Sequence, residues 1–148
     1  MEGQGYVVPF WDGPAPIYRD TIGKNVYLNM MHNARDYLYI TTPYLICDHE
    51  LLSVLRIAAK KGVDVRLITP HIPDKKTVFL MTRSNYRALL RDGVKIYEYT
   101  PGFIHANNII CDDKFAVCGT INLDYRSLVH HFECGPLPAG TRLQGFRI

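Results

Sequence analysis

The chain has 148 residues, of which 47% are hydrophobic and 21% are charged, and its formal net charge is +3. This composition is typical of one globular domain that buries a core without disulfide staples. The charge excess is too small to indicate nucleic-acid binding, and no apolar stretch reaches the roughly 18 residues of a transmembrane helix. The first ten residues also lack the basic and apolar regions of a secretory signal, so we expect the chain itself to be soluble.

Hydrophobic periodicity and turn residues predict alternating strands and helices along the first hundred residues. In chain order, they predict a strand at 6–9, a loop at 11–16, a helix at 24–35, a strand at 37–43, a helix at 48–62, a strand at 63–70, a helix at 77–93 and a strand at 94–101. Asp48 is expected to cap its helix, and Gly62 and Gly93 to end the two helices that precede them. This alternation predicts an α/β fold with a mixed, largely parallel sheet sandwiched between helices.

The segment that follows interrupts the alternation. Two apolar runs, 106–111 and 114–118, flank Asp112 and Asp113 and predict an antiparallel hairpin added to the sheet. Residues 136–148 show no sustained period, and we expect an irregular tail, appended artificially or produced by a frame shift, after a domain that spans 1–135.

The four cysteines follow no zinc-ligand spacing, and the sequence predicts no metal site. Cys47, Cys111, Cys118 and Cys134 form neither a Cys-x-x-Cys pair nor a set with spaced histidines. We expect reduced, mostly buried thiols in a cytosolic setting.

Residues 105–122 place a histidine, an aspartate and a Gly-Thr-x-Asn turn at regular distances. On a strand, His105 and Asn107 would point to the same face. Thr120 offers a hydroxyl and Asn122 an amide, which suit the acceptor oxygens of a phosphate. Each of these residues alone is more often an ordinary turn, cap or surface residue.

The combined pattern His-x-Lys-x4-Asp-x6-Gly-[Ser/Thr]-x-Asn resembles the motif of the phospholipase D superfamily, with the lysine missing. Beyond the motif, the blocks PFWDGP, YITTPYL, GVDVRLITPHIPDKK, GVKIYEYTPGFIHA and GTINLDYRSL..HFECG are similar to the C-terminal catalytic half of bacterial cardiolipin synthases. The resemblance implies one half-unit of the phospholipase D-like fold. It also implies a phosphatidyltransferase that joins two phosphatidylglycerols into cardiolipin and releases glycerol, with no cofactor and no metal.

The resemblance also implies a role for each matched residue. His105 would be the general acid and base, Asp112 the structural acid of the motif, and Glu133 the carboxylate that orients the histidine. Thr120 and Asn122 would bind phosphate oxygens. His130 and His131 match no catalytic position, and we expect them to be packing or surface residues.

Position 107 departs from the family. The lysine expected there would place a positive charge on the phosphate oxygens, and Asn107 replaces it only weakly. We therefore expect impaired catalysis, and none by the chain alone, because the family joins two motifs and this chain has one. The missing partner would be an N-terminal half with the first motif or a homodimer mate, and the parent enzyme would lie on a face of the bacterial cell membrane.

Two alternatives remain open. The chain could be a homodimeric phosphodiesterase or nuclease of the same superfamily, although it lacks a strong basic stripe for backbone phosphates. It could also be a phosphate-binding domain without catalysis, which the asparagine at position 107 favours.

Overall fold

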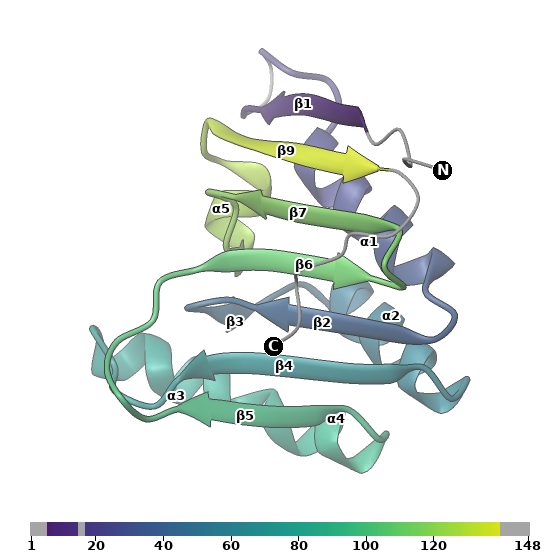
Figure 1. Cartoon of the computed structure of the whole chain (residues 1–148). Helices are drawn as coiled ribbons and strands as arrows, with labels where there is room; N and C mark the ends of the chain where they lie inside the picture. The colour runs from purple at the N-terminus through teal and green to yellow at the C-terminus, as the bar shows by residue number, and fades with distance from the viewer. Residues whose placement is uncertain (1–5, 15–16, 140–148) are drawn as a thin grey trace.

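The computed structural model describes residues 6–14 and 17–139. The helices are α1 (Ile22–Asn33), α2 (His49–Lys60), α3 (Lys76–Ser84), α4 (Tyr86–Arg91) and α5 (Tyr125–Val129). The strands are β1 (Tyr6–Asp12), β2 (Tyr37–Thr41), β3 (Leu45–Ile46), β4 (Asp64–Pro70), β5 (Lys95–Tyr99), β6 (Asn107–Cys111), β7 (Phe115–Gly119), β8 (Leu123–Asp124) and β9 (Glu133–Ala139). A seven-stranded sheet in the order β1-β9-β7-β6-β2-β4-β5 forms the centre, and β3 pairs with β8 in a small second sheet (Figure 1).

The central sheet is mixed, as predicted. The pairs β2/β4 and β4/β5 are parallel, whereas the pairs β2/β6, β6/β7, β7/β9 and β9/β1 are antiparallel. The predicted hairpin is confirmed, with Asp112 and Asp113 at positive φ in its turn. The parallel arrangement is therefore limited to the section from β2 to β5, because the hairpin and the two strands beyond it all return antiparallel.

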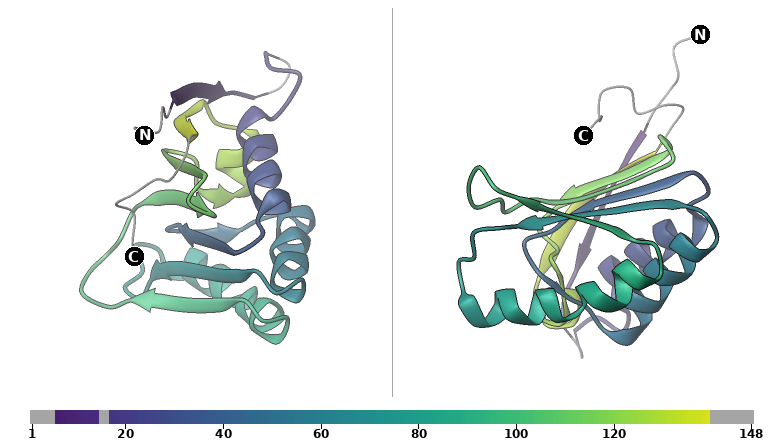
Figure 2. Two further views of the ribbon diagram at one scale, coloured as in Figure 1. Left: turned by 45° about the vertical axis from the view of Figure 1, so that its right-hand side comes forward. Right: turned by 90° about the horizontal axis from the view of Figure 1, so that it is seen from below.

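All helices of the described chain lie on one face of the sheet (Figure 2). The prediction of helices on both faces was wrong for these residues. Strand order advances in one direction from β2 through β4 to β5, and right-handed crossovers in one direction place their helices on the same side. Helix α2 contacts both α1 and α4 in this single layer.

The core lies between the sheet and this helix layer. Leu38, Ile40 and Leu67 point from the sheet into it and are almost completely buried, as is Leu55 from α2. Alternate strand residues point to the helix-free face, where Trp11 is 60% exposed. One face is thus a packed core and the other a surface of the described domain.

Local signals fixed several element ends. The Asp48 side chain accepts a hydrogen bond from Leu51 N (3.1 Å) at the start of α2, and Gly62 and Gly93 adopt φ values of +94° and +97° after α2 and α4. The helix predicted at 77–93 is divided at Asn85. There the Asn85 side chain donates to Leu45 O (2.9 Å) and thereby holds β3 against the helix junction.

Two further predictions are corrected. Strand β9 continues to Ala139 and pairs with β1, so residues 136–139 are not irregular and the predicted boundary at 135 falls inside a strand; residues 140–148 lie outside the described part. The predicted loop at 11–16 begins as strand, because β1 extends to Asp12.

The prediction of mostly buried thiols was also wrong. All four cysteines are free, but Cys118 and Cys134 are exposed, Cys111 is buried and Cys47 is partly buried. No helix within residues 6–14 and 17–139 is long and apolar enough to cross a membrane.

Candidate functional site

The predicted site residues, apart from Asp112, lie at one end of the strands, where the parallel strands have their carboxyl ends; this end is called the carboxyl edge of the sheet below. Strands β2, β4 and β5 end there, and β6 begins there, two residues after His105 (left in Figure 1). The turn at 119–122 follows β7 at the same edge, and Gly119 pairs with Asn107 across the hairpin. Ligands of open α/β sheets bind outside the carboxyl ends of the strands, so this edge is the candidate site.

The buried Thr42, which directly follows β2, links two segments at this end of the sheet by hydrogen bonds. Leu123 N donates to Thr42 Oγ1 (3.2 Å), which in turn donates to Tyr44 O (2.8 Å). These bonds tie β8, next to Asn122, to the end of β2. Thr42 thus anchors the end of the turn that carries the predicted phosphate contacts.

His105 is exposed and packs against two aromatic rings. The ring centroids of Phe103 and Tyr44 are 5.9 Å and 6.1 Å from its imidazole centroid, both in edge-on geometry. Because β6 begins only at Asn107, the strand alternation that predicted a shared face for His105 and Asn107 does not extend to the histidine. Its imidazole is open to a ligand from the solvent side.

Glu133 contacts Thr120 and not His105. The Thr120 hydroxyl donates to the Glu133 carboxylate, while His131 Nδ1 lies 3.7 Å from Glu133 Oε1. Backbone bonds reinforce this contact: Thr120 N donates to Cys134 O (3.1 Å), and Cys134 N donates to Thr120 Oγ1 (3.2 Å). In this structure Glu133 therefore orients the turn at 119–122, and its histidine neighbour is His131, which the sequence predicted to be a packing or surface residue.

Asn107 is buried, with 7% of its surface exposed. Its Nδ2 donates to Thr120 O (3.1 Å), and its Oδ1 is buried without a hydrogen-bond partner among the described residues. The amide therefore bridges the start of β6 and the turn at 119–122. It would have to give up this bond to reach a phosphate.

Asn122 is held by a residue that the sequence did not single out. Its Nδ2 donates to Ser127 Oγ (3.0 Å), and its own Oδ1 is buried without a partner in the described part of the chain. Ser127 is fixed in turn, because its backbone N donates to Asp124 Oδ1 (2.8 Å) at the first turn of α5. Asp124 is a preferred type of residue at a helix N-cap, and this signal could have located the helix.

Asp112 lies at the opposite end of β6. Its carboxylate accepts hydrogen bonds from the backbone N of Arg35 (2.8 Å), Asp36 (2.9 Å) and Tyr37 (2.8 Å). A strand rises about 3.3 Å per residue, so the whole length of β6 separates Asp112 from His105. Asp112 fixes the start of β2 and is not part of the edge that carries His105.

Two hollows adjoin the sheet. One of about 340 Å³ lies beside the site, and its lining residues are Tyr44, Ile46, Lys75, Val78, Asp124, Tyr125, Arg126 and His130. Tyr44 lines this hollow and also packs against His105. Burial and a hydrogen bond to Asp74 raise the pKa of Tyr44 to about 12, so its side chain stays uncharged.

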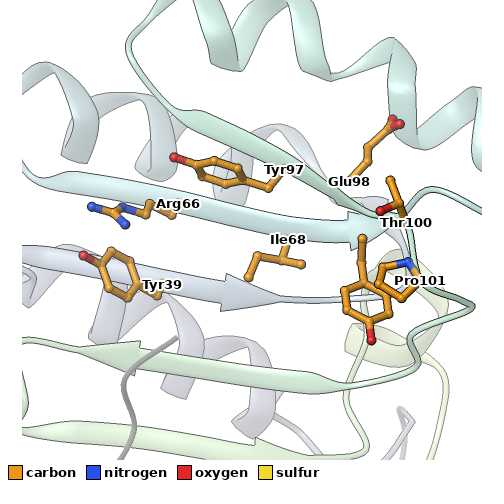
Figure 3. A pocket seen from close by; sticks show the side chains of 8 residues that line it. Tyr39, Arg66, Ile68, Tyr97, Glu98, Thr100 and Pro101 are labelled. Carbon is orange, nitrogen blue, oxygen red and sulfur yellow. The ribbon is translucent and has the colours of Figure 1, made fainter.

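The second hollow, of about 410 Å³, lies on the helix-free face (Figure 3). Arg66 lies there between Tyr39 and Tyr97, with its guanidinium carbon 4.7 Å from the Tyr39 ring centroid. Hydrogen bonds from Arg66 and from Lys95 lower the pKa of Asp64 to about 2. None of the predicted site residues lines this hollow, and within the described ranges no group of three or more His, Cys, Asp or Glu side chains could hold a metal ion.

Comparisons with known proteins identify relatives of this arrangement. A sequence profile described as "Cardiolipin synthase, PLD-like domain" matches residues 27–141. An uncharacterized protein of Streptococcus mutans is 56% identical over 130 residues, which cover 88% of this chain and 28% of that protein. A cardiolipin synthase of Halalkalibacterium halodurans is 44% identical over 133 residues, 90% of this chain and 26% of that protein. The chain thus spans about a quarter of the length of these relatives.

Solved structures share the fold at low sequence identity. Nuc of Salmonella typhimurium, a phospholipase D family member, has a TM-score of 0.74 at 14% identity and matches 93% of this chain and 85% of its own. Phosphatidylserine synthase of Haemophilus influenzae has a TM-score of 0.73 at 18% identity, over 91% of this chain and 35% of its own. These similarities confirm the predicted phospholipase D-like fold.

Proposed function

Because the chain belongs to the family of PLD-like domains of cardiolipin synthases, we propose that it is one half of a phosphatidyltransferase. The reaction condenses two phosphatidylglycerols to cardiolipin and releases glycerol at a membrane face. The other half of the site, with a second motif, comes from the remainder of a longer protein or from a second copy of the chain. No metal or cofactor takes part in this proposal.

The proposed chemistry proceeds in two steps. In the first, a histidine of the other half bonds to phosphorus, the bond from phosphorus to the glycerol oxygen breaks, and His105 gives its proton to that oxygen. In the second, His105 takes the proton of the acceptor hydroxyl, whose oxygen bonds to phosphorus as the bond to the first histidine breaks. Imidazole suits both steps because it gives and accepts protons near neutral pH.

The observation that carries this proposal is the exposed His105 beside the turn at 119–122, at the carboxyl edge of the sheet. Two donors of the turn become available by small rearrangements. A rotation of the Asn122 amide would let the Ser127 hydroxyl donate to Oδ1, which now lacks a partner, and would free Nδ2 for a phosphate oxygen. The Thr120 hydroxyl would exchange its bond to Glu133 for a phosphate in the same way.

Asn107 makes this half-site weak. A neutral amide supplies no charge to the phosphate oxygens, and its Nδ2 is already bonded to Thr120 O. The loss of one preorganised donor lowers rates by on the order of 10²-fold to 10³-fold. We therefore propose low activity even with both halves present.

The test pairs the chain with the part of a cardiolipin synthase that carries the first motif, in vesicles that contain phosphatidylglycerol. Cardiolipin and glycerol should form together, and His105→Ala should lower the rate by at least about 10²-fold. His32→Ala is the matched control, because this exposed histidine lies in the last turn of α1, away from the site. Cardiolipin formation that survives His105→Ala would contradict the proposal.

A phosphate-binding domain without turnover is the second candidate. It is favoured by the buried, already bonded amide of Asn107, which leaves this half-site without the expected cation. Saturable binding of inorganic phosphate without product formation by the paired halves would support it. Gel filtration with a nuclease assay tests the homodimeric alternative, for which a tight dimer that cuts single-stranded DNA is required.

A further inference from the structure

The 340 Å³ hollow beside the site lies between α3, α5 and the small sheet of β3 and β8. Tyr44 is a wall of this hollow and also packs edge-on against His105, with 6.1 Å between the ring centroids. The hollow is therefore separated from the histidine by a single aromatic ring. A molecule bound in it would lie next to the reacting groups without occupying their place.

The lining of the hollow includes two cationic side chains that form no ion pair with the described residues. Lys75 and Arg126 are both exposed, and no carboxylate of residues 6–14 and 17–139 lies within ion-pair distance of either side chain. His130 adds a third nitrogen donor, and its ring packs against Tyr125 with 5.4 Å between centroids. Asp124 is the acidic group of the lining, and one of its oxygens already accepts from Ser127 N.

The remaining lining is apolar or aromatic. Ile46, Val78 and the exposed Tyr125 offer carbon surface next to the two cations. This combination suits a singly charged phosphodiester attached to short carbon chains, because arginine and lysine bind phosphate oxygens and the carbon surface contacts the glycerol groups.

We infer that this hollow binds the phosphodiester of the acceptor phospholipid, an inference that rests on the proposed transfer reaction. The donor phosphate must contact His105 and the turn at 119–122, so a phosphate behind the Tyr44 ring belongs to a different lipid. The free hydroxyl of a phosphatidylglycerol lies on its glycerol head group, beyond the phosphate. Anchoring the phosphate at Lys75 and Arg126 lets that head group extend past Tyr44 and present its hydroxyl to His105.

The direct test is titration of the 148-residue chain with glycerophosphoglycerol, the water-soluble deacylated form of phosphatidylglycerol, followed by calorimetry. Lys75→Gln and Arg126→Gln should each raise the dissociation constant by about threefold to tenfold. Lys76→Gln, the adjacent lysine outside the hollow, is the matched control and should not change it. Absence of saturable binding by the unaltered chain, or equal binding by all variants, would overturn the inference, as would equally tight binding of inorganic phosphate that the two substitutions do not affect.

A second measurement separates this inference from the proposed function. The chain paired with a first-motif half is given phosphatidylglycerol and ethanol, so that transfer yields cardiolipin or phosphatidylethanol. The double variant Lys75→Gln/Arg126→Gln should lower the ratio of cardiolipin to phosphatidylethanol by about tenfold, because ethanol has no phosphate to anchor. A parallel fall in both products would overturn the acceptor role. If the unaltered pair forms neither product, the proposed function fails, and the titration still decides whether the hollow binds the head group.

Discussion

Replacement of Asn107 by lysine is the most informative single substitution. Asn107→Lys would remove the hydrogen bond from Nδ2 to Thr120 O (3.1 Å) and the Oδ1 atom that has no partner among the described residues. Loss of the bond should lower the free energy of unfolding by about 1 kcal/mol, and an ammonium at a site that is 7% exposed adds a desolvation penalty. A bound phosphate would form an ion pair with that ammonium group and so remove the penalty. The rate of transfer should therefore rise by roughly 10²-fold while the free domain becomes less stable.

The assay measures cardiolipin formed by the chain paired with a first-motif half, alongside urea unfolding with and without inorganic phosphate. Asn108→Lys is the control, because it adds the same charge to the next residue of β6, on the opposite face of the sheet beside Cys118. Only Asn107→Lys should raise the rate and gain stability from phosphate. Equal rates for the unaltered chain and Asn107→Lys would refute the role assigned to position 107.

Three further predictions concern the supports of the fold and the site. Asp112→Asn should lower the free energy of unfolding by about 2 kcal/mol in urea titrations, because three backbone N–H groups lose a charged acceptor, whereas Asp113→Asn at the exposed neighbour should change it little. Ser127→Ala should lower the transfer rate about tenfold, because Asn122 loses the partner that orients its amide, and should lower the free energy of unfolding by about 1 kcal/mol; an unaltered rate would contradict this. Asp64, whose pKa its arginine partner lowers to about 2, stabilises the fold above about pH 4 and loses this effect as the pH falls toward 2. The difference in urea midpoint between the unaltered chain and Asp64→Asn should therefore vanish over that range, and a constant difference would exclude this origin.

Sequence patterns predicted the elements whose determinants are local. The Asp48 cap, the glycines that end α2 and α4, and the two aspartates of the hairpin turn all act through their own backbone or that of near neighbours. The strand β9 was missed because its prolines oppose strand prediction, yet it pairs with β1, about 130 residues away in the chain. Long-range pairing of this kind leaves no periodic signal in the sequence.

The resemblance singled out residues of the candidate site but could not give their hydrogen-bond partners. His105, Thr120 and Asn122, which it singled out, lie at the same end of the sheet in the structure. Glu133 was expected beside His105, but its carboxylate binds Thr120, because β9 pairs its backbone with the turn at 119–122. Side-chain partners across strands depend on register, which motif spacing does not determine.

The bonds between Asp112 and the start of β2 explain why the motif has a fixed number of residues between its histidine and its aspartate. His105 and Asp112 stand at the two ends of a strand that is paired on both sides, with β2 and with β7. Insertion of one residue in β6 would send every following side chain to the other face and break either the anchor at Asp112 or the bridge at Asn107. The number of residues between His105 and Asp112 therefore matches the length of β6, and Asp112, at the far end of this strand, fixes the register on which the position of His105 depends.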